Sequence, residues 1–169
     1  HFITIFIPSK PLRRKVRNAL INIYIERAYT LRELIFGKIK IFKSCPASFE
    51  LPETHSPLVS IIVPVYNQYK YTLLCLWAIL QNSGSIPYEV ILADDNSDDE
   101  TKEIGSKIKN LKIVRNKENL RFLKNCNNAA KSAKGKYLLF LNNDTQVQPG
   151  WLKPLVDLME KDPATGLCG

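Results

Sequence analysis

Histidine, cysteine and glycine are all scarce in this 169-residue sequence. One histidine is the first residue and the other lies in a proline-rich stretch, so neither a histidine-assisted serine hydrolase nor a Cys/His zinc site is supported. The cysteines are far apart and form no C-x-x-C pair, which is typical of packing in a reducing compartment. These residues are His1, His55, Cys45, Cys75, Cys126 and Cys168. No apolar run approaches the roughly 18 to 20 residues that a membrane-spanning helix needs.

Glycine-rich phosphate-binding motifs are also absent. Neither G-x-G-x-x-G nor G-x-x-x-x-G-K-[ST] occurs, which excludes the dinucleotide fingerprint and the P-loop. The segment "DDNSDDE" has polar residues at a calcium-loop spacing from Asp94, but Asp99 occupies the position that needs glycine. Gly105 stands where the loop needs its bidentate glutamate, so a calcium loop is excluded as well.

The positive charge of the chain is concentrated at its front. Residues 1–56 carry ten Lys/Arg and four Asp/Glu, a net charge of +6, whereas residues 57–169 carry a net charge of +2. The pattern predicts a basic amphipathic helical extension over residues 1–43 and a linker over residues 44–57. Basic residues at a helix start oppose the helix dipole. Two explanations stay open: the extension packs on protein, or residues 10–36 lie on an anionic membrane surface, while nucleic acid is not supported.

From residue 58 onward the sequence alternates between strand and helix patterns. Strands are predicted at 58–66, 88–95, 111–116 and 136–143, the last as a central strand buried on both faces. Helices are predicted at 71–82, 122–133 and 151–161, the second of them closed by Gly135. Another helix is predicted to start at the capping box Ser97-x-x-Glu100. This alternation predicts an α/β domain with a mainly parallel sheet and helices on both faces.

Polar side chains follow each predicted strand at its carboxyl end, where open parallel sheets bind their ligands. They are Tyr66 and Asn67, Asp94 and Asp95, Asn116 to Asn119, and Asn142, Asn143 and Asp144. Local roles stay open too, because Asn and Asp favour turns and helix starts, and Tyr66 can pack on the rim. Carboxylates at such an edge can accept hydrogen bonds from a base or ribose and can hold a divalent ion against a diphosphate. The rim therefore predicts a nucleotide site that uses no glycine loop.

Four segments occur in the order and spacing of a known family: "VSIIVPVYNQ", "VILADDNSDDET", "NKENLRF" and "AKGKYLLFLNNDTQVQPGWL". Over about Pro57 to Gly169 the chain resembles the family 2 glycosyltransferases, which have the GT-A fold. The resemblance implies an inverting sugar transfer from a uridine or thymidine diphosphate sugar, with Mg²⁺ or Mn²⁺. The site residues that it implies are Pro64, Tyr66 and Asn67 in the base pocket, Asp95 at the base with Asp94 beside it, Asn143 near the ribose and Asp144 at the metal.

Two positions depart from this family pattern. Asn142 replaces the first acid of the D-x-D-type motif, which leaves Asp144 as its one carboxylate. Arg121 stands where many members have glycine, and its guanidinium either contacts the diphosphate or lies in solvent. The family's catalytic base is expected beyond Gly169. The domain at 58–169 is therefore expected to be incomplete and to bind donor and metal with little or no turnover.

The resemblance further implies a glycan or lipid-linked acceptor and a cytoplasmic protein, peripheral on the inner face of a membrane. Two other functions stay open, a nucleotidyltransferase of similar sheet topology and a non-catalytic interaction domain. The first is disfavoured because "PVYNQYKY" contains no glycine-rich basic loop. The second is disfavoured because the polar rim is retained.

Overall fold

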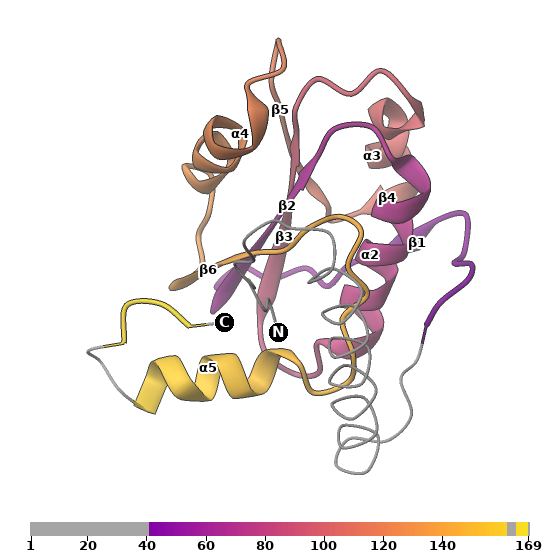
Figure 1. Cartoon of the computed structure of the whole chain (residues 1–169). Coiled ribbons are helices and arrows are strands. Elements are labelled where there is room, and N and C mark those ends of the chain that lie inside the picture. The colour runs from indigo at the N-terminus through magenta and orange to yellow at the C-terminus, as the bar shows by residue number, and fades with distance from the viewer. Residues whose placement is uncertain (1–40, 162–164, 169) are drawn as a thin grey trace, which may run out of the picture. The chain divides into compact units, whose positions relative to one another are not determined.

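The computed structural model describes residues 41–161 and 165–168. Its main element is a four-stranded parallel sheet in the order β5-β3-β2-β6 (Figure 1). The strands are β2 (Val59–Val65), β3 (Tyr88–Asp94), β5 (Lys112–Arg115) and β6 (Tyr137–Phe140). The four predicted strands and their parallel arrangement are thus confirmed.

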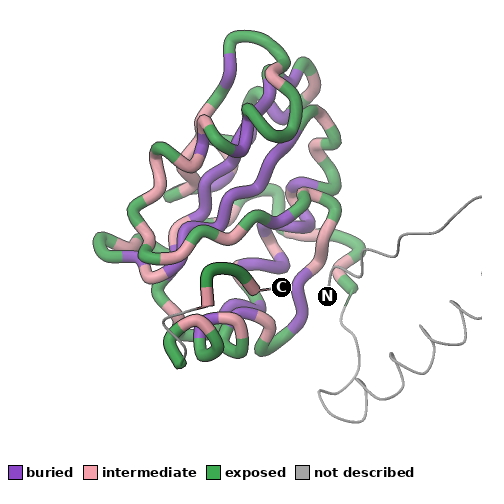
Figure 2. The backbone as a smooth tube through the Cα atoms, turned by 60° about the vertical axis from the view of Figure 1, so that its left-hand side comes forward, coloured by how far each residue is buried: buried purple, intermediate pink, exposed green. Residues whose placement is uncertain are grey.

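The centre of the sheet is formed by β2 and β3, whose aliphatic and β-branched residues suit burial on both faces. Every residue of β2 is buried, and the burial colouring of Figure 2 shows both strands running through the interior. The two strands pair along their whole length, from Val59 opposite Tyr88 to Val65 opposite Asp94. They therefore end at the same level, and the polar residues that follow them share one edge.

Helices cover both faces of the sheet, as the alternation predicts. They are α2 (Tyr69–Asn82), α3 (Ile104–Lys107), α4 (Arg121–Ala130) and α5 (Leu152–Lys161). Leu76 of α2, Ile104 of α3 and Val156 of α5 join the larger hydrophobic cluster. Ala129 of α4 packs with Ile62 in a second cluster, and Figure 1 shows α4 across the sheet from α2. The result is a three-layer, Rossmann-like arrangement.

The prediction that the last strand is buried on both faces is wrong for the described part of the chain. There, β6 lies at an edge of the sheet, and its residues alternate between half-buried and exposed. Leu138 and Phe140 are 49% and 43% exposed, whereas Tyr137 and Leu139 pack against the larger cluster. An apolar run indicates a strand but does not reveal which neighbours cover it.

Part of the predicted linker is packed structure. β1 (Phe49–Glu50) pairs in parallel with β4 (Ile108–Lys109), and Leu51 directly after it is buried. The Phe49 ring meets the Trp77 ring of α2 edge to face, with centroids 5.2 Å apart. The Pro, Ser and Thr content predicted a linker, and within it the apolar side chains of Phe49 and Leu51 pack against the rest of the domain.

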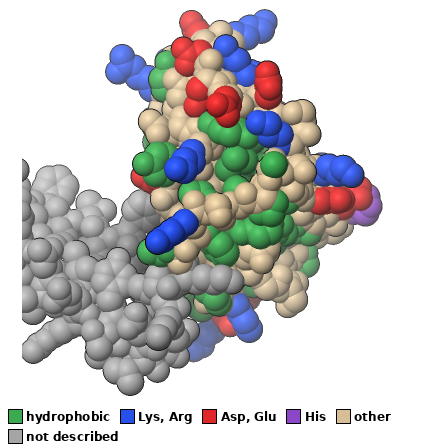
Figure 3. All heavy atoms as spheres, turned by 90° about the vertical axis from the view of Figure 1, so that its right-hand side faces the viewer, with side chains coloured by type: hydrophobic (Ala, Val, Ile, Leu, Met, Phe, Trp, Pro, Cys, Tyr) green, Lys and Arg blue, Asp and Glu red, His purple; other side chains and the backbone are tan. Residues whose placement is uncertain are grey.

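The predicted extension over residues 1–43 lies, apart from its last three residues, outside the described residues. Within the described residues, no helix is long and apolar enough to cross a bilayer. On the face drawn in Figure 3, acidic and basic side chains are interspersed with hydrophobic ones. This agrees with the small net charge of +2 on residues 57–169.

Gly135 does not close a helix, because α4 already ends at Ala130. Instead it lies against β2, where a Cβ atom on it would be 2.5 Å from Ser60 N and 2.8 Å from the carbonyl carbon of Val59. The Gly135 amide donates a hydrogen bond to Ser60 Oγ at 2.9 Å. Glycine is needed here because two backbones approach closely.

Candidate nucleotide-binding site

A cleft of about 240 Å³ opens at the carboxyl end of the sheet, beside the start of α4. Four of the predicted nucleotide-binding residues line it together, Pro64, Tyr66, Asp95 and Asn143. Arg121 of α4 and Asn142 line it as well. The remaining predicted residues, Asn67, Asp94 and Asp144, lie outside this lining.

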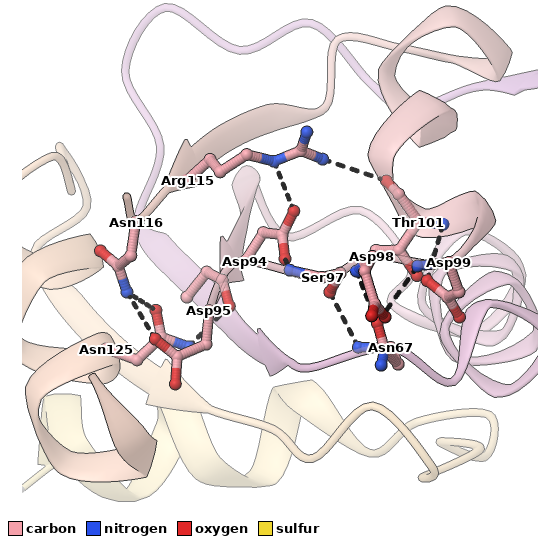
Figure 4. Close-up of polar contacts among 11 residues, drawn as sticks. Asn67, Asp94, Asp95, Ser97, Asp98, Asp99, Thr101, Arg115, Asn116 and Asn125 are labelled. Carbon is pink, nitrogen blue, oxygen red and sulfur yellow. Dashed lines mark hydrogen bonds and ion pairs between the residues drawn. The ribbon is translucent and has the colours of Figure 1, made fainter. Parts of the chain in front are cut away.

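Asp94 and Asp95 are adjacent in sequence but have different surroundings. Asp94 is fully buried, and its Oδ2 accepts a hydrogen bond from Arg115 Nε at 2.6 Å. Its Oδ1 accepts from Ser97 N at 2.9 Å, and Figure 4 shows both contacts. A buried carboxylate needs partners of this kind to offset its desolvation. The contacts of Asp94 therefore hold together β3, β5 and the loop after β3.

Asp95 faces the cleft and the start of α4. Its Oδ1 accepts hydrogen bonds from Leu120 N at 2.7 Å and Asn116 Nδ2 at 2.9 Å. Its Oδ2 accepts from Arg121 N at 2.8 Å. The two backbone amides belong to a helix start, where N–H groups have no partner within the helix. Because each carboxylate oxygen has two acceptor positions, Oδ2 can accept one further N–H from a ligand.

Buried side-chain amides hold the Asp95 carboxylate in this position. Asn116 Nδ2 donates to Asp95 Oδ1 and to Asn125 Oδ1, each at 2.9 Å (Figure 4). Asn125 Nδ2 donates to the Ala93 carbonyl at 2.7 Å, and Asn128 Nδ2 donates to Asn116 Oδ1 at 2.8 Å. The sequence did not single out Asn125 or Asn128. The two asparagines are three residues apart and so lie on one side of the predicted helix. Amides on a side that packs against the sheet need polar partners, and this was the signal that could have indicated their role.

Asn67 joins the loops that follow β2 and β3. Its backbone N donates to Ser97 Oγ at 2.8 Å, and its Oδ1 accepts from Asp98 N at 2.8 Å (Figure 4). Its φ angle of 60° lies in the left-handed region, which asparagine tolerates better than most residues. The contacts of Asn67 thus hold the segment that carries Tyr66, which is 52% exposed at the cleft.

The predicted capping box at Ser97 is wrong. The helical turn begins later, at the 3-10 helix η1 (Glu100–Glu103), and Asp99 is its N-cap. Asp99 Oδ1 accepts from Thr101 N at 2.9 Å, while Oδ2 accepts from Tyr69 N, the first residue of α2, at 3.0 Å. One carboxylate therefore satisfies amides at the starts of two helices. The sequence pattern missed this because Tyr69 is 30 residues away.

Replacing Asp99 with alanine is expected to lower the free energy of unfolding by about 1 to 2 kcal/mol, because two helix starts lose their acceptor. Burial acts to raise the pKa of Asp99, but hydrogen bonds from Thr101 and the Tyr69 amide outweigh it and hold the pKa below the ordinary 3.8. The stabilisation is therefore present above about pH 4 and is lost as the pH falls through the folded-state pKa. Urea denaturation across this pH range measures it.

The adjacent Asp98 provides the matched control for that measurement. Its side chain is exposed, so Asp98→Ala is expected to change the stability by less than about 0.5 kcal/mol. Equal stabilities of the two variants at neutral pH would contradict the double-capping role of Asp99.

Asn142, Asn143 and Asp144 follow β6 at the same edge of the sheet. Asn143 Nδ2 donates to Thr72 Oγ1 of α2 at 3.0 Å, so its Oδ1 is available as an acceptor. The Asn142 carbonyl accepts from Thr145 N at 3.1 Å within a turn. Asp144 is exposed, and among the described residues its carboxylate takes part in none of the ion pairs.

The carboxylate and amide oxygens of Asn142, Asn143 and Asp144 fit a hard divalent cation that also binds the phosphates of a substrate. Mg²⁺ is commonly bound by one or two carboxylates together with substrate phosphates, and Asp144 with the neighbouring amide oxygens supplies oxygen ligands of that kind. Within residues 41–161 and 165–168, no group of three His, Cys, Asp or Glu residues is placed to hold a metal alone.

Burial, with the nearby Asp144 charge, raises the pKa of Cys75 to about 12, so its thiol stays protonated at neutral pH.

The sequence matches the family described as "Glycosyl transferase family 2" over residues 60–169. The match runs from β2 to the end of the chain and includes every polar segment at the carboxyl edge of the sheet. The chain belongs to this family. The parallel sheet with helices on both faces is the GT-A architecture that the resemblance implied.

Curated relatives align with about two thirds of the chain. Polypeptide N-acetylgalactosaminyltransferase 11 of Xenopus tropicalis is 31% identical over 121 residues, which cover 66% of this chain and 20% of that protein. Chondroitin synthase of Escherichia coli is 30% identical over 115 residues, which cover 66% of this chain and 17% of that protein. This family 2 chain thus spans a fifth or less of each of these two relatives.

Solved structures of TarS from S. aureus, residues 1–349, resemble the domain as well. One has a TM-score of 0.53 and 31% sequence identity, covering 61% of this chain and 32% of that chain. The other, a complex with UDP, has a TM-score of 0.53 and 27% identity, covering 66% of this chain and 38% of that chain. A structural relative of this glycosyltransferase domain is therefore known with a bound nucleoside diphosphate.

Proposed function

We propose that the cleft binds the nucleotide of a uridine or thymidine diphosphate sugar and that the whole protein transfers the sugar. The observation that carries this proposal is the Asp95 carboxylate, which lines the cleft with one acceptor position on Oδ2 unused. The imide of uracil or thymine presents one N–H donor, which complements that position. The UDP complex of TarS, similar over 66% of this chain, supports the choice of nucleotide.

The other cleft residues fit the remaining parts of a nucleotide. The half-exposed Tyr66 ring and Pro64 offer apolar surface to a base, and Asn143 Oδ1 can accept a hydrogen bond from a ribose hydroxyl. Asn67 and Asp94, which the resemblance also placed at the nucleotide, have side-chain oxygens that accept hydrogen bonds from protein groups. In this proposal they position the edge that carries Tyr66 and Asp95.

Asp144 is the residue that would hold Mg²⁺ or Mn²⁺, with the amide oxygens of Asn142 and Asn143 as neighbouring donors. Such a cation, when bound, supplies positive charge that stabilises a departing diphosphate. The role of the chain is to keep this carboxylate next to the cleft by the turn in which Thr145 N donates to the Asn142 carbonyl at 3.1 Å. A single carboxylate predicts weak metal binding in the absence of nucleotide.

Replacing Asp144 with alanine is expected to remove the gain in UDP affinity that Mn²⁺ produces, a gain of about tenfold or more in the unchanged protein, because the carboxylate is the one charged metal ligand. Calorimetric titration with UDP and thymidine diphosphate, with and without Mn²⁺, measures this. Asp98→Ala removes an exposed carboxylate near the same edge and is expected to leave the gain intact. Absence of metal-dependent binding in the folded chain would count against the proposed function.

We propose an inverting transfer to a glycan or lipid-linked acceptor, with the base that activates the acceptor hydroxyl located beyond Gly169. We also propose that the protein is cytoplasmic and that residues 10–36 dock on an anionic membrane face, because residues 1–56 carry a net charge of +6. Equal binding to neutral and anionic vesicles at low salt would contradict the membrane contact.

A further inference from the structure

Arg121 combines three features at the start of α4. It lines the cleft together with Asp95, Asn142 and Asn143. Its backbone φ angle of 65° lies in the left-handed region, although it is not glycine. Its backbone N donates to Asp95 Oδ2 at 2.8 Å and to Asn119 Oδ1 at 3.1 Å, and these two bonds hold the residue in that conformation.

Arg121 is a poor choice for the stability of the fold at this position. A side chain in the left-handed region clashes with its own backbone, which glycine avoids. A cation at a helix N-terminus also opposes the helix dipole. The first turn of α4 adds a second cation, Lys124, and it contains no acid that would compensate. Among the described residues, the Arg121 guanidinium takes part in none of the ion pairs. Folding therefore does not account for the side chain, whereas its place on the cleft suggests a ligand.

We propose that Arg121 binds the diphosphate of the nucleotide. Its guanidinium supplies part of the positive charge that a metal ion held by two carboxylates would otherwise supply. This inference rests on the proposed nucleotide site. Asn142 stands where a second acid would strengthen metal binding, so Asp144 is the single carboxylate available to a cation. A guanidinium can donate two parallel hydrogen bonds to phosphate oxygens and keeps its charge at every physiological pH.

Two side chains of the cleft then have different chemistry. The charge of Asp95 is already compensated by two backbone amides and one side-chain amide, so it favours a neutral N–H donor such as that of the base. The Arg121 guanidinium has no such compensation among the ion pairs of the described residues, so it favours the diphosphate, which carries several negative charges. The consequence is measurable affinity for the diphosphate without metal, and this part of the affinity falls as salt screens the charges.

The experiment compares uridine with UDP in the 169-residue chain by calorimetry, in the presence of EDTA at low salt. Arg121→Ala is expected to weaken UDP binding by about 10- to 100-fold while changing uridine binding by less than about twofold. Arg121→Lys is expected to recover part of the loss, because a point charge replaces the fork. Lys117→Ala, which removes an exposed cation from the loop before α4, is the control and is expected to bind UDP normally.

Arg121→Gly separates charge from backbone strain. It removes the guanidinium and relieves the left-handed conformation, so UDP binding as weak as in Arg121→Ala would support a role of the charge. If folded Arg121→Ala or Arg121→Gly bound UDP with the affinity of the unchanged chain, the proposed role of Arg121 would be wrong, whereas the proposed nucleotide site would not be contradicted. Failure of the unchanged chain to bind both uridine and UDP, with and without Mn²⁺, would overturn the proposed function and this inference with it.

Discussion

Replacing Asp95 with asparagine is expected to weaken UDP binding by about 100-fold and to lower the free energy of unfolding by about 3 kcal/mol. An amide has one acceptor oxygen, whereas the carboxylate accepts from Leu120 N, Arg121 N and Asn116 Nδ2. The NH₂ group of the variant would point at one of these donors or at the base imide. Two donors facing each other in a buried place leave both unsatisfied. Calorimetry with UDP and urea denaturation measure the two effects separately.

The neighbouring residue offers a matched control. Asp94→Asn removes a buried carboxylate that pairs with Arg115, so it is expected to destabilise the fold by a similar amount. Because Asp94 positions the edge but does not line the cleft, its loss of UDP affinity, measured below the unfolding transition, is expected to be clearly smaller than that of Asp95→Asn. Normal UDP binding by folded Asp95→Asn would contradict the proposed recognition of the base.

Replacing Gly135 with alanine is expected to lower the free energy of unfolding by about 3 kcal/mol. The added Cβ atom would lie 2.5 Å from Ser60 N and 2.8 Å from Ser60 Oγ. The first of these is a backbone atom of the central strand β2, which cannot move without disturbing its pairing with β3 and β6. The loss of the Gly135 N to Ser60 Oγ hydrogen bond, 2.9 Å long, would add to the effect.

Gly166→Ala is the control for this steric argument, because a Cβ atom at Gly166 meets no atom within 4 Å. It is expected to change the stability by less than about 0.5 kcal/mol. The midpoints of urea denaturation of the two variants measure the difference. If Gly135→Ala were as stable as Gly166→Ala, the close approach between residue 135 and β2 would be contradicted.

Some of the site was predictable because it depends on local pattern. Apolar runs that end in Asn and Asp predicted both the strands and the edge at which their polar residues meet. Asp95, Tyr66 and Asn143 were placed in the nucleotide site by their match to a family motif, and the structure brings all three to one cleft. The cap at Asp99 was not predictable in this way, because one of its partners is the amide of Tyr69 in another helix.

By itself, the sequence determined the order of the four main strands and the helices between them, the parallel sheet and the polar character of one edge, because these follow from hydrophobic periodicity along neighbouring residues. The tertiary structure alone decided which polar groups at that edge are open to a ligand. Asp94 turns to Arg115 of β5, whereas Asp95 turns to the start of α4 and the cleft. The same holds for β6, whose Leu138 and Phe140 are exposed because the strand lies at a sheet edge in the described residues. Burial and hydrogen-bond partners depend on residues distant in sequence, which no local pattern specifies.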